Sequence, residues 1–130
     1  MWLKIQEADV VDTNGMLFTK ESLQKAADRF NNDAGKVVHF GTGIGGPVGL
    51  NRASVLMKRM EVRNDEKELW IDVEFLKSEL GDDMSKYIGM FYPDTVECRP
   101  CGFINSKEEK GNITIINDFT CTDITLLAKR

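Results

Sequence analysis

Alternating apolar and polar side chains predict β-strands over much of this chain. The clearest alternation covers residues 69–75, where Leu69, Ile71 and Val73 are separated by other residues and would share one face of a strand. Further strands are predicted over residues 2–11, 36–40, 48–63 (as one strand or two), 95–104, 113–116 and 124–128. Pro100 interrupts the strand at 95–104, which places it at a sheet edge, a bulge or a strand end.

Two segments have helical spacing instead. The first follows Thr19, a good N-cap residue, and runs to about residue 31. Its apolar residues recur with the i, i+3, i+4, i+7 spacing of one helix face, and they are Leu23, Ala26, Ala27 and Phe30. A shorter helix is predicted over residues 77–89, although Gly81 has a low helix propensity. The apolar side of that helix would carry Leu80, Met84 and Ile88.

Turn signals separate these elements. Asn14-Gly15 favours a tight turn, residues 64–68 form a charged turn, and the polar residues 105–112 are expected to form a hairpin loop. The total is about six or seven strands and two helices, with no internal repeat or linker, so one domain over residues 1–130 is expected. The predicted class is α+β and β-rich, a bent sheet or barrel with helical insertions.

Composition excludes several classes of function. The chain has 130 residues, 42% of them hydrophobic, and no apolar run approaches the ~20 residues that cross a bilayer. The formal net charge is −4 and no stretch is densely basic, whereas nucleic-acid binding usually leaves a basic footprint. We therefore expect a soluble protein with neither a membrane nor a nucleic acid as its partner.

A glycine-rich segment has the glycine spacing of the dinucleotide-binding fingerprint. Gly41, Gly43 and Gly46 have the G-x-G-x-x-G spacing after a predicted strand. That fingerprint works by opening a helix whose N-terminus holds the pyrophosphate, but here Pro47 and a β-prone run follow. A surface loop is therefore the better interpretation, and no cofactor is expected.

The cysteines and the single histidine offer two kinds of chemistry. Cys98, Cys101, Cys121 and His39 would together form a valid tetrahedral zinc set, although a structural site usually has a second close pair of ligands. Burial of the cysteines as small apolar residues is the simpler interpretation. A thiol could instead act as a nucleophile with His39 as its base, which requires the two side chains to lie within hydrogen-bond reach.

The order of several motifs resembles the tailed-phage prohead (capsid maturation) proteases. Residues 10–23, VVDTNGMLFTKESL, resemble the opening of that family, and VVH at 37–39 resembles the strand that carries its catalytic histidine. GPVG at 46–49 resembles the start of the next long strand, and residues 62–75 resemble the hairpin that follows. TVECRPCG at 95–102 resembles the nucleophile strand, and residues 118–127 resemble the last core strand. The resemblance implies a herpesvirus-protease-like bent sheet or barrel flanked by helices.

The nucleophile strand departs from the family pattern, which reads S-S-R-G-x-G. Arg99 and Gly102 are kept, both serines are gone, and the nucleophile position holds Glu97 or Cys98 depending on register. A glutamate cannot replace the serine, and loss of a triad nucleophile costs about 10⁶ in kcat. Cys98 is chemically capable, but Pro100 has no N–H to donate to an oxyanion hole.

These departures favour a phage head-associated structural protein on an inactive prohead-protease-like domain, acting as a decoration, cement or minor capsid component. The resemblance implies the major capsid protein, copies of itself or both as partners, a homo-oligomer or larger assembly, and a location in the virion after assembly in the host cytoplasm. No catalytic residue is assigned. A vestigial site would contain His39, Glu97, Cys98 and Arg99. The alternatives are a cysteine-variant capsid maturation protease using Cys98 and His39, and a small zinc-stabilised binding domain.

Overall fold

The computed structural model describes residues 1–34, 39–42 and 52–129, which contain seven strands in two sheets and two helices. The fold is α+β and β-rich, as predicted. The elements in chain order are β1 (Trp2–Glu7), β2 (Met16–Phe18), α1 (Lys20–Ala34), β3 (His39–Gly41), β4 (Val55–Arg63), β5 (Glu68–Phe75), α2 (Glu79–Phe91), β6 (Val96–Lys110) and β7 (Ile113–Ala128). Neither helix in the described part of the chain is long and apolar enough to cross a membrane.

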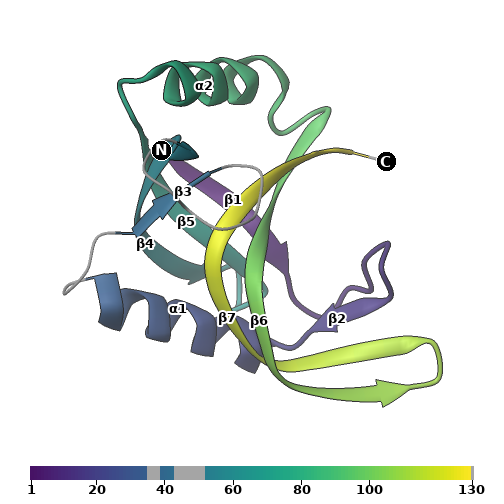
Figure 1. Cartoon of the computed structure of the whole chain (residues 1–130). Coiled ribbons are helices and arrows are strands. Elements are labelled where there is room, and N and C mark those ends of the chain that lie inside the picture. The colour runs from purple at the N-terminus through teal and green to yellow at the C-terminus, as the bar shows by residue number, and fades with distance from the viewer. Residues whose placement is uncertain (35–38, 43–51, 130) are drawn as a thin grey trace.

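The strands form two sheets that face each other across the core. One sheet has the order β1-β5-β4-β3 with antiparallel neighbours, and the other has the order β2-β7-β6, in which β2 runs parallel to β7. Figure 1 shows that β6 and β7 are long and strongly curved, and that the closed end of their hairpin extends beyond the core, with β2 beside it. Strands β1 and β6 approach each other, but no ladder joins the two sheets within the described residues, so they form no closed barrel there.

Helix α1 covers one end of the core, packed against β7 and β4. The Thr19 hydroxyl accepts a hydrogen bond from the Ser22 N–H at 3.1 Å, which confirms the predicted N-cap. All four residues of the predicted apolar stripe are buried. The helix ends at Ala34, a few residues later than the sequence pattern indicated.

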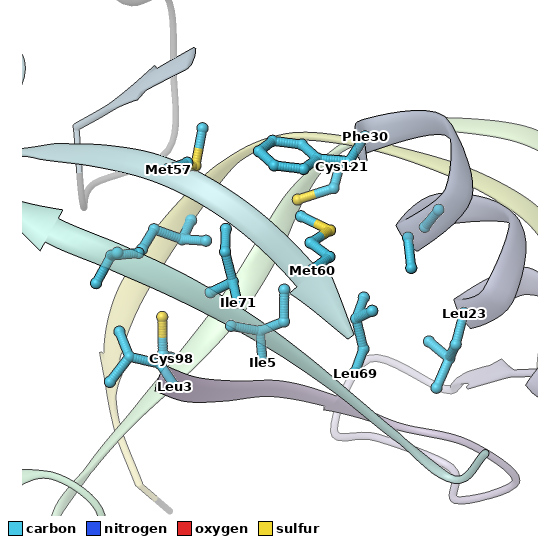
Figure 2. Close-up of a cluster of buried hydrophobic side chains, with 14 of the residues drawn as sticks. Leu3, Ile5, Leu23, Phe30, Met57, Met60, Leu69, Ile71, Cys98 and Cys121 are labelled. Carbon is cyan, nitrogen blue, oxygen red and sulfur yellow. The ribbon is translucent and has the colours of Figure 1, made fainter. Parts of the chain in front are cut away.

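The core lies between the two sheets and α1 (Figure 2). The alternation in β5 is confirmed, because Leu69, Ile71 and Val73 all point inward and are at most 1% exposed. Burial of each such side chain contributes roughly 1.5–3 kcal/mol. The turn before this strand has positive φ at Asn64, Asp65 and Glu66.

Helix α2 begins at a Ser78 cap and is rotated relative to the prediction. The Ser78 hydroxyl accepts from the Gly81 N–H at 3.1 Å. Gly81 lies on the buried side of the helix. A Cβ at this position would lie 2.0 Å from the Leu76 carbonyl oxygen, so only glycine fits. Leu80 was predicted to share the buried side with Met84 and Ile88, but it is 43% exposed.

The final hairpin differs most from the sequence prediction. Residues 105–112 were expected to form a loop, yet β6 continues to Lys110 and the chain turns at Gly111, where φ is +62°. The two strands predicted at 113–116 and 124–128 are one continuous β7. The polar side chains of this hairpin arm resemble those of a loop. The arm is nevertheless a pair of strands, because backbone hydrogen bonds join β6 to β7, and its polar side chains are tolerated because both of its faces reach solvent. Strand β2 was missed because three residues carry too little periodicity.

Candidate functional site

The two candidate nucleophile positions on β6 face opposite sides of the strand. Cys98 points into the core and is 2% exposed, and Figure 2 shows it beside Leu3. Glu97 and Arg99 point the other way, with Arg99 Nε 3.7 Å from Glu97 Oε1. Arg99 Nη2 also lies 3.7 Å from Oδ2 of Asp12, in the turn before β2.

Burial suppresses the acid–base chemistry of the Cys98 thiol. Its pKa is raised to about 12, mainly by loss of solvation and to a smaller extent by the nearby Cys101 and Asp123. A cysteine nucleophile acts as the thiolate, which requires a lowered pKa and a positive environment. At pH 7, roughly one thiol in 10⁵ with such a pKa is ionised. In this structure, Cys98 is therefore a buried residue of the hydrophobic core.

Pro100 and Gly102 have structural roles in the same strand. Pro100 lies on an edge strand, paired in register with Ile124, where a missing N–H is tolerated. The register shifts between Cys101 and Gly102, and a Cβ at Gly102 would lie 1.8 Å from the Thr120 carbonyl oxygen. Glycine at this position is therefore required by strand pairing alone, whatever its catalytic role in related sequences.

His39 lies at the start of β3 and contacts a hydrophobic neighbour. Its ring packs on Phe30 with the ring centroids 4.8 Å apart. Its Nε2 is buried and has no hydrogen-bond partner among the described residues. Figure 2 shows Phe30 next to Cys121, in a different part of the core cluster from Cys98. His39 therefore packs at the Phe30 end of the core, whereas Cys98 packs beside Leu3.

Asp123 on β7 is a buried carboxylate that sequence reasoning passed over. It is 1% exposed, and Oδ1 accepts hydrogen bonds from the N–H groups of Thr42 at 2.9 Å and Ile124 at 2.7 Å. Its Oδ2 accepts from the Thr42 hydroxyl at 2.6 Å. Asp123 thus ties the end of β3 in one sheet to β7 in the other. The signal in the sequence was an acid two residues from Cys121, in phase with a buried position.

The cysteines do not assemble a metal site. All three are free, with Cys98 and Cys121 buried and Cys101 half-buried. Burial also raises the Cys121 pKa to about 12, and its thiol donates to the Asp123 carbonyl oxygen at 3.2 Å. Within the described part of the chain, which includes His39 and the three cysteines, no three His, Cys, Asp or Glu side chains are grouped to bind a metal ion. The zinc alternative is therefore not supported.

Only part of the glycine-rich segment lies within the described residues. Gly41 closes β3, and a Cβ there would lie 2.9 Å from Val55 Cγ2 and 3.0 Å from Asp123 Oδ1. This glycine is therefore explained by close packing between β4 and β7. Gly43, Gly46 and the GPVG motif lie outside the described residues.

Two grooves open on the surface. The larger, with a volume of about 850 Å³, lies between β1, residues 10–18 and the β6 and β7 ends, and both Glu97 and Arg99 line it. The Tyr92 hydroxyl accepts from the Lys4 N–H at 2.9 Å beside this groove. The smaller groove, of about 400 Å³, lies between α2 and the adjacent ends of β6 and β7.

Comparison with known proteins identifies the fold. No protein-family model and no curated protein sequence matches the chain. Among solved structures, the bacteriophage T4 capsid assembly protease, gp21, aligns with 98% of this chain and 79% of its own, with a TM-score of 0.68 and 20% sequence identity. The chain therefore has a prohead-protease-like fold, as the order of its motifs predicted.

Proposed function

We propose that this chain is a phage head-associated structural protein that uses a prohead-protease-like domain without proteolysis. It binds the major capsid protein, copies of itself or both, as a decoration, cement or minor capsid component. The proposal places it in the virion, after assembly in the host cytoplasm. The fold likeness to a capsid assembly protease supports the link to phage heads.

The buried thiol of Cys98 is the observation that carries the proposal. Residues 95–102, which resemble the nucleophile strand, include no serine. Glu97 points away from the core beside Arg99, and Cys98 is 2% exposed with a pKa raised to about 12. A buried neutral thiol cannot attack a peptide carbonyl at a useful rate. In this proposal, the domain keeps the fold and has lost the reactive group.

The test combines a cleavage assay with a binding assay. Purified protein is incubated with capsid and scaffold precursors, the products are analysed by mass spectrometry, and mature heads are sedimented with the protein. We expect intact precursors and co-sedimentation of the protein with heads. Cleavage that disappears in the Cys98→Ala variant contradicts the proposal, and so does failure to bind precursors and heads alike.

A cysteine-variant maturation protease is the second candidate. The buried His39 Nε2 favours it, because this nitrogen has no hydrogen-bond partner among the described residues and is available as an acceptor for a thiol. This candidate requires Cys98 to leave the core and meet His39. A thiol-directed acylating probe tests it: labelling that is lost in both Cys98→Ala and His39→Ala supports the protease. Labelling no faster than that of a small free thiol excludes it.

A further inference from the structure

Helix α2 carries a second apolar stripe that the fold does not cover. Its buried side consists of Gly81, Met84 and Ile88, which face the core. Beside it lie four large apolar side chains that are 37–71% exposed, namely Leu80, Tyr87, Met90 and Phe91. The Tyr87 and Phe91 rings stack with centroids 6.3 Å apart. A short helix with this much exposed apolar area is typical of a surface that meets a partner.

This stripe borders the smaller groove. Leu80 and Tyr87 form one wall, and Leu126 and Leu127 of β7 form the other, with Leu127 itself 47% exposed. Among the described residues that line the groove, Asp83 is the one that carries a charge. The space of about 400 Å³ suits a few side chains of a linear segment.

The charges around the stripe are unpaired. Glu79, Asp82 and Asp83 occupy the first turns of α2, and none of them has an ion pair within the described residues. Two lysines flank them, so residues 77–94 carry four carboxylates against two ammonium groups. The α2 side of the groove is therefore apolar with a net negative charge.

The outer face of the β1-β5-β4-β3 sheet provides the contrast, because its charges satisfy one another. Glu7 pairs with Lys4 at 2.7 Å, and Glu74 pairs with Lys58 at 3.4 Å. The Arg63 guanidinium lies 4.6 Å from the Trp2 ring centroid and 4.8 Å from that of Trp70. These charges on the sheet are paired, whereas three carboxylates of α2 have no ion pair within the described residues.

We propose that the groove beside α2 binds a linear segment of a partner protein that presents apolar side chains flanked by Lys or Arg. The apolar side chains enter between Tyr87 and Leu127, and a basic group pairs with Asp83. The inference goes beyond the proposed function, since it names a surface and a ligand chemistry. It holds whether or not the domain cleaves peptides.

A second copy of this chain fits the α2 surface less well. Antiparallel pairing of two α2 helices would place each acidic first turn against a last turn that has no basic residue. That end also carries the negative pole of the helix dipole. Parallel pairing would bring the acidic turns together. Charge complementarity therefore favours a basic partner over self-association.

The test uses a fluorescein-labelled amphipathic peptide made of Leu, Lys and Arg, and a matched peptide with Glu in place of Lys and Arg. Fluorescence anisotropy measures binding to the full chain. We expect a micromolar dissociation constant for the basic peptide and at least ~10-fold weaker binding by the Asp83→Lys and Tyr87→Ser variants. Binding of the basic peptide should also weaken as salt is raised.

Glu108→Lys is the matched control, because it makes the same charge change on the distant, exposed hairpin arm. Urea midpoints confirm that each variant is folded. Three results overturn the proposal: the two peptides bind with equal affinity, the Glu108→Lys variant loses as much affinity for the basic peptide as Asp83→Lys does, or the basic peptide does not bind. A concentration-dependent dimer that Tyr87→Ser abolishes also overturns it, by assigning the surface to self-association.

Discussion

The three cysteines differ in exposure, and this difference sets their reactivity. Cys98 and Cys121 are 2% and 6% exposed, whereas Cys101 is half-buried. Burial raises the pKa of each thiol, and for the two buried ones to about 12. The sequence favoured burial of the cysteines as small apolar residues, and this prediction is correct for Cys98 and Cys121.

A thiol-labelling experiment checks this order. In native protein at pH 8, we expect Cys101 to react with an aromatic disulfide reagent at least ~100-fold faster than Cys98 and Cys121, since both exposure and thiolate fraction favour it. The Cys101→Ser variant should lose the fast phase, and urea should expose the remaining two thiols. A fast phase that survives in Cys101→Ser and disappears in Cys98→Ala would show that Cys98 is not held in the core.

Asp123 is a buried carboxylate that stabilises the fold by accepting hydrogen bonds from Thr42 and Ile124. The Asp123→Ala variant leaves the N–H groups of Thr42 and Ile124 without their acceptor. A hydrogen bond to a charged group contributes about 1.5–3 kcal/mol, so the loss of these two bonds should lower the free energy of unfolding by about 3–6 kcal/mol. Asp94→Ala is the control, because Asp94 is exposed. Equal urea midpoints for the two variants would contradict the anchoring role.

At the scale of elements, alanine substitutions at the two glycines of α2 are expected to change stability in opposite directions. Gly81→Ala places a Cβ 2.0 Å from the Leu76 carbonyl oxygen, so the helix must shift and stability should fall by more than about 2 kcal/mol. A Cβ at Gly89 meets nothing within 4 Å, so Gly89→Ala should gain about 0.5–1 kcal/mol from helix propensity. Urea denaturation measures both changes, and the same sign for both would refute this packing of α2.

Elements whose residues alternate or recur regularly were predicted well. Helix α1 and strand β5 bury the residues that their periodicity indicated. The prediction for the hairpin arm was wrong because every residue from Gly102 to Asn112 is exposed, which removes the alternation that identifies a strand. The error at Leu80 has a different cause: the buried side of α2 includes Gly81, and a glycine adds no apolar side chain to the pattern from which that side was predicted.

For the whole molecule, the buried thiols link stability to alkaline pH. The pKa of Cys98 and of Cys121 is raised from 9.0 to about 12 in the folded state. Their contribution is fully present below pH 9 and is lost as pH rises toward 12, because only the unfolded chain then releases these protons. Each thiol contributes a slope of at most about 1.4 kcal/mol per pH unit.

Urea midpoints measured between pH 8 and 10.5 test this linkage. We expect stability to fall steadily above pH 9 in the natural chain and less steeply in the Cys98→Ala variant, which retains only one buried thiol. The Cys101→Ser variant, which changes a half-buried thiol, serves as the control and should keep a slope closer to that of the natural chain. A slope unaffected by Cys98→Ala would contradict the burial of this thiol.

The sequence by itself determined the α+β class, the α1 stripe, the alternation in β5 and the order of motifs that resembles prohead proteases. It also limited Pro100 to a sheet edge, a bulge or a strand end. These features are encoded by spacing along the chain and by the backbone limits of proline and glycine. Only the tertiary structure decided that Cys98 packs in the core while Arg99 reaches Asp12, and that Asp123 holds Thr42 across two sheets. Such relations join residues far apart in the chain, so they depend on how the sheets meet.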